Sequence, residues 1–426
     1  MVEARSARVI RSESRFVILR AILRRQPVTR QELTAETGLS TATVANIVTE
    51  LLKAEVIEVD SVGSSTGRPF TRLAIANDRA CLVGVDAAET YIAAHAYNLS
   101  LEPIGQASIA LDERRNEPAY VLQSIDDVVT RALADAGHDA SAPAQVGISF
   151  PGQVQADTGV SIFAPNWSWH QVNVRELLRS HTKLRGPVHI DNPLKAIAMA
   201  ELWLNPLAAD QLVTLNLGTG VGGAIVRGGK LVTGASNNAG EWGHTTLVMG
   251  GRPCRCGRRG CAEAYVGAAG IRQTLIDIAP HHPSAGLGQT EFIHSMIDGL
   301  RREEQPFVEV ADQVGRHLAT LIGNIINAAN PEAVLLTGWV FNQLEPWLLP
   351  VVRSHLAEEA LESSLAGVTV GRLELEGNPV TLGMAIFALE DFLSRLGVPS
   401  RVLPAEPDRV VPARSPRRTA TVQAAD

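Results

Sequence analysis

The stretch that decides the fold runs from residue 241 to residue 263 and reads EWGHTTLVMGGRPCRCGRRGCAE. It holds three of the chain's four cysteines, Cys254, Cys256 and Cys261, and His244 lies ten residues before the first of them. One imidazole and three thiolates form a complete tetrahedral ligand set for zinc. Because four protein ligands leave no position for a reactive water, the pattern predicts a structural zinc ion and not a catalytic one.

Two other interpretations of the cysteines are weaker. Buried free thiols beside an unrelated histidine would need apolar surroundings, but four arginines lie among them. A disulfide is disfavoured because Cys254 and Cys256 are nearly adjacent and nothing in the sequence points to an oxidising compartment. The four arginines are Arg252, Arg255, Arg258 and Arg259.

Two carboxylates, Glu241 and Glu263, bracket this stretch. With the glycines around them they give G-E-W-G-H followed by C-x-C-G-x-x-G-C-x-E, which resembles the sugar-binding and zinc motif of the ROK family of repressors, open reading frames and sugar kinases. The resemblance implies that Glu241, His244 and Glu263 contact sugar hydroxyls, and that zinc ties down the loop presenting them. A P-N-x-x-W segment at residues 165–169 adds Asn166 as a further ligand-binding candidate.

Composition bounds the class of protein. A chain of 426 residues with 45% hydrophobic residues can form two or three domains. No apolar run approaches the roughly 20 residues of a transmembrane helix, the N-terminus lacks a signal-peptide pattern, and cysteines are few, so we expect a cytoplasmic protein without a membrane partner. Residues 1–79 hold 12 Lys+Arg against 9 Asp+Glu, a net +3, while the whole chain has -7. The remainder is therefore -10, which suggests that only the front end meets a polyanion.

The front end has the pattern of a DNA reader. After an arm at residues 1–13, which we expect to be loose, helices are predicted from about residue 14 to Pro27, from Arg30 to about Thr37, and from about residue 41 to 54. Thr29 opens a capping box, and Ser40 can cap the third helix. One face of that helix is apolar and the opposite face is small and polar, as in helix-turn-helix recognition helices.

A wing is predicted to follow the three helices. Strands at residues 56–60 and 70–76 flank a flexible loop at 61–69 that ends in S-T-G-R-P. This order resembles the DNA-binding domain of ROK repressors, which implies that Arg68 lies near the DNA backbone or minor groove. The alternative is a three-helix packing module or one that binds protein. The candidate DNA contacts are Thr29, Ser40, Thr41, Thr43, Asn46 and Arg68.

The rest of the chain fits an α/β body. Strand and helix patterns from residue 80 onward follow the order of the first lobe of the actin-like ATPase fold used by sugar kinases. The resemblance covers residues 14–396 and implies a winged helix-turn-helix at 1–79 and a two-lobed, ROK sugar-kinase-like effector domain at 80–396. Residues 397–426, rich in Pro, Arg and Ala, are expected to be disordered.

Two kinase motifs are altered. A ROK kinase has D-x-G-G-T at its first phosphate loop, where this chain has Asp86-Ala87-Ala88-Glu89-Thr90, so side chains and a carboxylate stand where polyphosphate should approach. It also has N-D-x-N, in which the Asp is the catalytic base, where this chain has Asn192-Pro193-Leu194-Lys195. Pro193 cannot accept a proton, and Asp191 stands two places from the base position. We therefore expect no catalytic residues and no enzyme activity.

A second phosphate loop is retained only in sequence. Residues 218–223 contain the string G-x-G-x-x-G, but a strand follows it, which excludes a dinucleotide fingerprint. Trp339 replaces the second glycine of a pair that kinases place beside adenosine, which further crowds a nucleotide.

The sequence therefore predicts a sugar-responsive transcriptional regulator, most often a repressor, of carbohydrate uptake or catabolism genes. Its expected partners are operator DNA, a sugar or sugar derivative, and further copies of itself in a homodimer or tetramer. One alternative is a ROK sugar kinase with a DNA-binding head; another is a regulator controlled by a partner protein. Lys195 leaves open that the ligand is an acidic or phosphorylated sugar.

Overall fold

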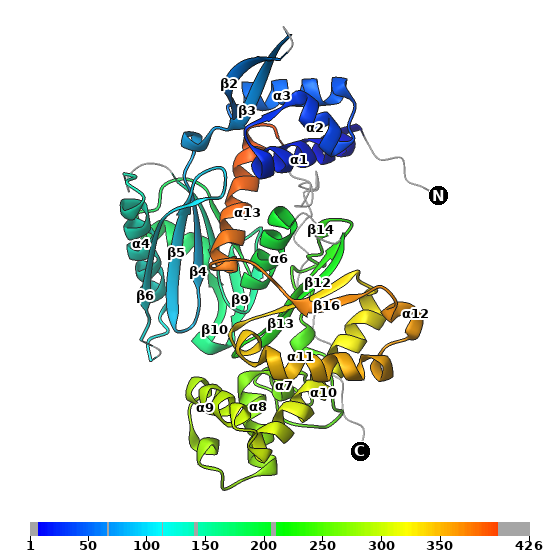
Figure 1. Cartoon of the computed structure of the whole chain (residues 1–426). Helices are drawn as coiled ribbons and strands as arrows, with labels where there is room; N and C mark the ends of the chain where they lie inside the picture. Colours follow the sequence, from blue (N-terminus) through cyan, green and yellow to red (C-terminus); the bar gives the residue numbers. More distant parts are fainter. Residues whose placement is uncertain (1–6, 66–67, 113, 140–143, 206–209, 399–426) are drawn as a thin grey trace, which may run out of the picture.

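The computed structural model describes residues 7–65, 68–112, 114–139, 144–205 and 210–398 (Figure 1). From residue 399 on, the tail that we expected to be disordered lies outside this part of the chain. The described residues form a small N-terminal head on top of a two-lobed body. None of the helices in these ranges is long and apolar enough to cross a membrane.

The head is a three-helix unit with a small antiparallel sheet. Its apolar core includes Leu33, Val44, Leu51 and Leu73, which are all fully buried. The predicted capping box is present, since Oγ1 of Thr29 accepts the backbone N–H of Glu32 and the Glu32 carboxylate accepts the backbone N–H of Thr29. The elements are α1 (Ala7–Arg25), β1 (Val28–Thr29), α2 (Arg30–Thr37), α3 (Thr41–Lys53), β2 (Ile57–Ser65) and β3 (Arg68–Ile75), with strand order β1-β3-β2.

Two predictions for the head were wrong. Residues 7–13 are the first turns of α1 and not a loose arm, and Arg11 and Arg15 form ion pairs with Glu50 of α3. The wing strands are also longer than expected, because residues 61–65 pair with residues 68–72. Gly63 permits this pairing, since a Cβ there would lie 2.5 Å from the ring of Phe70.

The first lobe is built on a mixed five-stranded sheet in the order β11-β7-β4-β5-β6. Strands β11, β7 and β4 run parallel, and β4, β5 and β6 form an antiparallel meander. Helix α4 packs on β5 and β6. The elements are η1 (Asn77–Arg79), β4 (Leu82–Ala87), β5 (Tyr91–Tyr97), β6 (Pro103–Ala110), α4 (Pro118–Asp135), β7 (Gln145–Ser149), β8 (Gln153–Gln155), β9 (Val160–Ala164), η2 (Pro165–Trp167), β10 (Trp169–Asn173), α5 (Val174–His181) and β11 (Val188–Asp191).

The second lobe repeats the strand arrangement of the first. Its sheet has the order β14-β13-β12-β15-β16, again with one antiparallel hairpin side and one parallel side. Its helices gather at the lower end of the molecule in Figure 1. The elements are β12 (Gln211–Leu217), β13 (Val221–Arg227), β14 (Lys230–Leu231), η3 (Trp242–His244), α7 (Glu263–Val266), α8 (Ala268–Ile278), η4 (Pro283–Gly286), α9 (Gln289–Arg301), α10 (Gln305–Ala329), β15 (Ala333–Thr337), α11 (Trp339–Glu359), α12 (Glu362–Leu365) and β16 (Thr369–Arg372).

Two helices, α6 (Pro193–Leu204) and α13 (Pro379–Arg395), join the lobes and reach the head (Figure 1). The backbone of α13 lies in direct contact with α6 and with β4, and a glycine makes each contact possible. A Cβ on Gly383 would fall 1.8 Å from the carbonyl oxygen of Ala196, and one on Gly84 of β4 would fall 1.7 Å from the carbonyl oxygen of Thr381. Helix α13 therefore lies against the first sheet with no side chain between them at this point.

This contact generates a stability prediction. Gly84→Val would place a branched side chain against the Thr381 carbonyl and force α13 away from β4. We expect the free energy of unfolding to fall by about 3 kcal/mol or more, measured by urea denaturation. Gly286→Val is the control, because a Cβ at Gly286 meets nothing within 4 Å. Equal stability of the two variants would contradict the assigned contact.

Candidate functional site

The residues from Thr245 to Ala262 form a loop that folds back on itself between η3 and α7. Two isolated bridges, Thr246 with Cys261 and Pro253 with Arg259, close it. A tight turn at its tip is closed by the Gly257 backbone N–H, which donates to the Cys254 carbonyl. Gly257 has φ +86°, a left-handed conformation that favours glycine. The turn brings residues on either side of it within reach of one ion.

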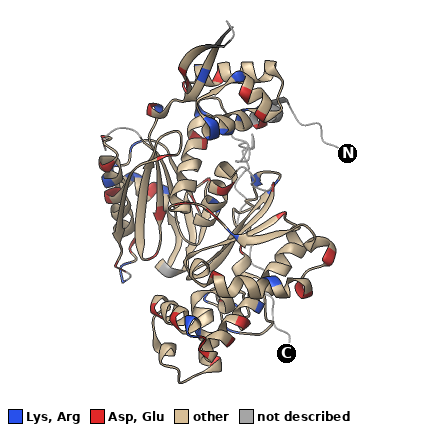
Figure 2. Cartoon of the chain, viewed as in Figure 1, with Lys and Arg blue, Asp and Glu red and all other residues tan. Residues whose placement is uncertain are grey.

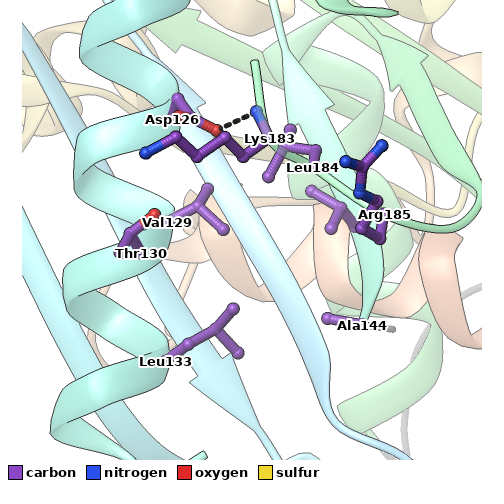
Figure 3. Close-up of a pocket in the computed structure, with 9 residues that line it drawn as sticks. Asp126, Val129, Thr130, Leu133, Ala144, Lys183, Leu184 and Arg185 are labelled. Carbon is purple, nitrogen blue, oxygen red and sulfur yellow. Dashed lines mark hydrogen bonds between the residues drawn. The ribbon is translucent and has the colours of Figure 1, made fainter. Parts of the chain in front are cut away.

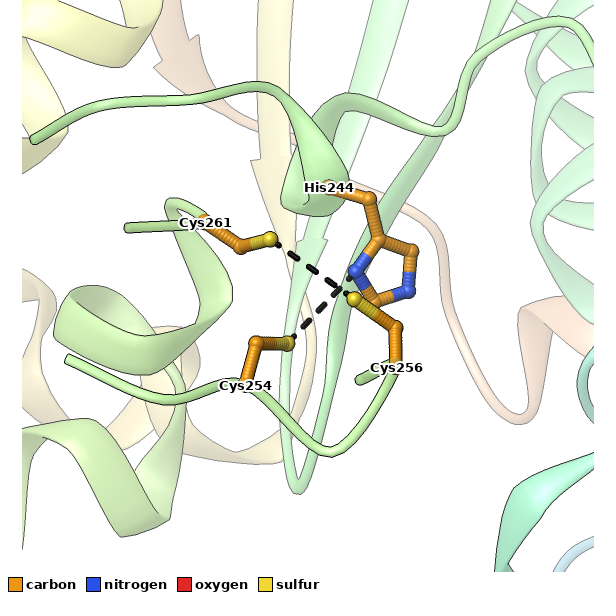
Figure 4. Close-up of side chains that lie close together, drawn as sticks. All are labelled: His244, Cys254, Cys256 and Cys261. Atoms are coloured by element: carbon orange, nitrogen blue, oxygen red, sulfur yellow. Dashed lines mark hydrogen bonds between the residues drawn. The ribbon is translucent and has the colours of Figure 1, made fainter. Parts of the chain in front are cut away.

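The four ligands expected from the sequence converge (Figure 4). The ligand atoms of His244, Cys254, Cys256 and Cys261 all lie within 4.8 Å of one another. The Nδ1 of His244 is 3.7 Å from the Cys254 sulfur, and the sulfurs of Cys256 and Cys261 are 3.7 Å apart. Tetrahedral zinc with bonds of about 2.3 Å to sulfur requires sulfurs about 3.8 Å apart, so the donor set and its spacing fit zinc.

Glu263 lies beside the cysteines and is already engaged. It is 7% exposed, and its Oε2 accepts the backbone N–H of Val221 at 3.0 Å. The guanidinium of Arg255 donates to both of its oxygens, from Nε at 2.9 Å and from a terminal nitrogen at 3.3 Å. Arg255 lies between Cys254 and Cys256, two of the expected zinc ligands, in the sequence. Through this ion pair the loop therefore holds the carboxylate that we expected to contact sugar.

Glu241 is the more available carboxylate. Burial raises the pKa of Glu241, whereas nearby His244 and Lys195 lower it and nearby Glu263 raises it further. The fold thus gathers three of the predicted ligand-binding residues, Glu241, His244 and Glu263, in one place. The side chain of the fourth, Asn166, lies outside the described part of the structure, although its backbone is in η2.

Lys195 forms an internal ion pair. Its ammonium donates to Oδ1 of Asp191 at 2.9 Å and to the backbone carbonyl of Asn237 at 2.8 Å, and the residue is only 4% exposed. The side-chain amide of Asn237 donates to the same Asp191 oxygen at 3.0 Å and to the carbonyl of Val154 at 2.7 Å. Asp191 is thus tied to Lys195 and Asn237. The charge of Lys195 is balanced within the protein.

Pro193, at the position of the kinase base, has a structural place. It is the first residue of α6, where a proline ring costs no hydrogen bond. The side chain of Asn192 caps the same helix by accepting the backbone N–H of Leu194 at 2.8 Å, and it also donates to the carbonyl of Gly152. These groups secure a helix end and offer no proton acceptor to a sugar hydroxyl.

The first phosphate-loop position is filled by the protein's own side chains. Asp86 is 5% exposed, and it accepts hydrogen bonds from Tyr91 at 2.7 Å, Asn378 at 3.2 Å and Ser149 at 3.4 Å. Burial raises the pKa of Asp86. A carboxylate enclosed by three protein donors is not free to serve a nucleotide or its metal.

The second phosphate loop, between β12 and β13, is also covered. A Cβ on Gly218 would lie 3.2 Å from the indole ring of Trp339, and a Cβ on Gly220 would lie 2.4 Å from the Arg255 guanidinium. In a phosphate-binding loop, glycines let phosphate oxygens approach the backbone closely. Here that approach is occupied by an indole and a guanidinium.

On the head, the candidate DNA contacts divide into two groups. Thr29 and Ser40 cap helices, and the hydroxyls of Ser40 and Thr43 lie 2.8 Å apart. Thr41 and Asn46 are exposed on α3. The side chain of Arg68 lies outside the described part of the structure, although its backbone begins β3. Thr41 and Asn46 are therefore best placed to reach base edges.

Four of the basic residues of the head form ion pairs. Besides the ion pairs with Glu50, Arg25 pairs with Glu36 and Arg79 with Glu55. Figure 2 shows basic and acidic residues intermixed on the head. In this view α3, with its exposed small and polar residues, is the part of the head whose shape and chemistry suit DNA.

Two hollows of the first lobe are less suited to bind a ligand than the region around Glu241 and His244. The one between α4 and residues 183–185 has a volume of about 20 Å³, room for about one water, and the Lys183 backbone N–H donates to Asp126 across it (Figure 3). A larger one of about 260 Å³ is bordered by Arg175, whose guanidinium donates to the carbonyls of Ala156, Thr158 and Val188. That guanidinium supports backbone and is not free for a ligand.

Comparison with known proteins places this geometry in a family. The family model described as ROK family matches residues 82–391, and a winged helix-turn-helix DNA-binding model matches residues 11–58. The chain belongs to the ROK family. Within it, the chain combines a DNA-binding head with a kinase-like body.

Three relatives frame the comparison. A xylose repressor of Caldicellulosiruptor bescii is 25% identical over 91% of this chain and 98% of its own length. A glucokinase of Halalkalibacterium halodurans is 30% identical over 66% of this chain and 86% of its own. The crystal structure of a ROK family transcriptional regulator, a homologue of the E. coli MLC protein, aligns with TM-score 0.73 and 25% identity over 92% of this chain and 99% of its own. The repressor and the regulator cover the head; the fold of this ROK member is thus a winged helix-turn-helix followed by the actin-like sugar-kinase fold.

Three residues that close parts of the site were not predicted from the sequence to be site residues. They are Asn237, Arg255 and Tyr91. Tyr91 lies one residue beyond the altered phosphate loop, and Arg255 lies within the zinc motif, so both were close to a recognised signal. Asn237 had one visible signal, the polar Ser-Asn-Asn run at residues 236–238 before the G-E-W-G-H segment.

The cysteine cluster generates a metal prediction. We expect about one zinc per chain in the purified protein, because the site offers four protein ligands. Cys256→Ser should reduce the zinc content severalfold, as measured by elemental mass spectrometry. Cys81→Ser is the matched control, since Cys81 is buried in the first lobe away from the cluster and should leave the zinc content unchanged. Retention of one zinc per chain by the Cys256 variant would show that the ligand set is wrong.

Proposed function

We propose that this protein is a sugar-responsive transcriptional repressor that binds operator DNA of carbohydrate uptake or catabolism genes and has lost kinase activity. The observation that carries the proposal is a DNA-binding head joined to a sugar-kinase body whose two phosphate loops are covered by Tyr91, Trp339 and Arg255. The repressor and regulator relatives, which match the chain over nearly its whole length, support the same function. Such a protein acts where the chromosome is, in the cytoplasm.

The kinase alternative has one argument in its favour, the glucokinase relative at 30% identity. Phosphoryl transfer depends on positioning the nucleotide and on a base for the attacking hydroxyl. Pro193 supplies no base, and Asp191 is tied to Lys195 and Asn237. Both requirements fail in the same chain, so we favour the repressor.

The effector that the site suits is a neutral sugar. Nearby, Lys195 is paired with Asp191 and Arg255 with Glu263, and no ion pair to Glu241 is found among the described residues. An acidic or phosphorylated sugar would add negative charge beside that carboxylate. Sugar hydroxyl groups, in contrast, can donate hydrogen bonds to the Glu241 carboxylate and to the remaining lone pairs of the Asp191 and Glu263 carboxylates. We therefore set aside the acidic ligand that Lys195 suggests in the sequence alone.

Zinc has a supporting role in this proposal. When bound, it would fix the loop of residues 245–262 through His244, Cys254, Cys256 and Cys261 and supply no reacting water. With Nδ1 of His244 turned toward the sulfurs, its Nε2 remains to meet a ligand. Arg255, on the same loop, holds Glu263 in place.

The regulatory step that we propose is a shift between two arrangements of the lobes. A sugar bound at Glu241 and His244 would favour one arrangement and so change the spacing of the heads in a homodimer. Helix-turn-helix dimers need half-sites about 34 Å or a multiple of it apart, so a small rotation costs much affinity.

The DNA-binding part of the proposal predicts an effect of Asn46→Ala. Loss of an amide that contacts a base edge should weaken binding about 10-fold or more, since a bidentate contact is worth about 1–3 kcal/mol. The measurement is fluorescence anisotropy with a DNA fragment selected from random sequence by the wild-type protein. Asn342→Ala changes an exposed asparagine on α11 and should leave affinity unchanged. Equal affinities for all three proteins would remove Asn46 from the DNA interface.

The effector part predicts selective stabilisation. Neutral sugars, with glucose, xylose and N-acetylglucosamine as the panel, are compared with glucose 6-phosphate and glucuronate in thermal unfolding of the zinc-loaded protein. A ligand at 100 times its Kd adds about 2.7 kcal/mol, so a binding sugar should raise the Tm visibly, and Glu241→Gln should remove the effect. No ADP should form when ATP is added. Stabilisation by the anionic sugars alone would refute the proposal that the effector is a neutral sugar. Formation of ADP would show that the protein is a sugar kinase after all.

A further inference from the structure

Helix α6 has one end in the ligand site and the other end on the DNA-binding head. At its first turn, Lys195 contacts Asp191 at the end of first-lobe strand β11 and the carbonyl of Asn237 in the second lobe. The side chain of Asn237 in turn donates to Val154 of first-lobe strand β8. We call Asp191, Lys195 and Asn237 the latch, because these three residues connect the two lobes at the start of α6.

The last turn of α6 contacts the first helix of the head. The indole ring of Trp203 meets the ring of Phe16 edge to face, with centroids 5.0 Å apart and planes at 87°. The guanidinium of Arg20 donates to the carbonyl of Leu202 at 3.0 Å. The indole N–H of Trp203 also donates to the buried carboxylate of Glu390 on α13 at 3.0 Å. The head therefore rests on the end of α6 through an aromatic contact and a charge-assisted hydrogen bond.

The part of α6 between these two ends is tightly packed. The nine residues from Lys195 to Trp203 are all buried, and the Ala196 carbonyl touches α13 at Gly383. Packed interiors move as rigid pieces and not by continuous deformation. Figure 1 shows α6 beside α13 directly below α1, so a small displacement at the latch has a short route to the head.

We propose that the latch residues Lys195, Asp191 and Asn237 are positioning residues that set the placement of α6 and, through Trp203 and Phe16, the placement of the DNA-binding head. This deepens the proposed function, since it names how the ligand site would communicate with the head. A ligand that engages Glu241 would enter beside the latch, because Asn237, whose carbonyl accepts from Lys195, lies four residues before Glu241 on the same second-lobe segment. Opening the latch removes the side-chain contacts by which Lys195, on the first turn of α6, and Asn237, on the second-lobe loop, are held to Asp191.

Two further polar contacts join the head to the body within the described residues. Gln26 donates to Ser100, and Arg15 donates to the carbonyl of Gly397 after α13. Neither contact includes a second-lobe residue. Both helices that reach the head connect to the second lobe at their opposite ends. Helix α13 follows second-lobe strand β16 after residues 373–378, whereas α6 is tied to the second lobe by the side-chain contacts of the latch. Helix α6 is therefore the route on which those contacts can act at α1.

The test is hydrogen–deuterium exchange of the full-length, zinc-loaded protein, without sugar or DNA. Lys195→Met should raise exchange at residues 232–240 and also at residues 16–25 of α1 by at least about threefold, because local opening is reported by local exchange. Residues 314–326 of α10, in the core of the second lobe, serve as the internal reference and should not change. Lys183→Met, at an exposed lysine, should behave as the wild type, and Lys195→Arg, which keeps a donor toward Asp191, should recover most of the protection.

A second variant changes the latch residue of the second lobe. It keeps the test valid if the Lys195 variant fails to fold. Asn237→Ala removes the amide contacts to Asp191 and Val154 without leaving a buried unpaired ammonium. It should raise exchange in the same two segments. If the loop at 232–240 opens in either variant while α1 stays fully protected, the proposal is overturned. Because neither sugar nor DNA is present, that result would leave the repressor function itself untouched, and a failed sugar panel would leave the latch untouched.

Discussion

Backbone contact between α6 and α13 is the constraint on which the rest of this structure depends. The Ala196 carbonyl occupies the space that a Cβ on Gly383 would need, and α13 meets the first sheet in the same way at Gly84. Two helices that touch without intervening side chains can be placed in few ways. The sheet of the first lobe therefore fixes α13, α13 fixes α6, and α6 carries both the ligand site at its start and the head at its end.

Two carboxylates at or beside kinase-motif positions are bonded by the protein's own side chains. Asp86 keeps its place at the end of β4 and is now bonded by Tyr91 and Asn378. Asp191 is likewise bonded by Lys195 and Asn237. Buried polar groups need partners, so a buried carboxylate without a bound substrate is stable only when the protein supplies donors. In both places those donors are side chains of the chain itself.

Local signals explain what could be predicted from the sequence. The four expected zinc ligands lie within 18 residues of one another, and the capping box and the amphipathic α3 are each contained in a short segment of chain. The latch could not be predicted, because Asn237 is 42 residues from Lys195 and reaches it through the fold of the second lobe. The altered N-D-x-N motif drew attention to Lys195. The direction of the Lys195 side chain is set by its ion pair with Asp191, which lies four residues earlier, across the start of α6. The long wing was missed because Gly and Ser at residues 63–65 are typical of a loop, and only the partner strand makes them a ladder.

The pairing of charges at the ligand site also bears on how such a sensor can respond. A ligand shifts an equilibrium only by the difference between its affinities for the two states. In the latched arrangement, Lys195 and Arg255 are each satisfied by a carboxylate, so a sugar gains little by approaching them there. In the opened arrangement that we propose, Asp191 and the Asn237 carbonyl would become acceptors for sugar hydroxyls, and Lys195 would gain access to sugar oxygens. The hydrogen bonds of the latch would then be the ones that a sugar replaces, so their strength would set the concentration at which it does so.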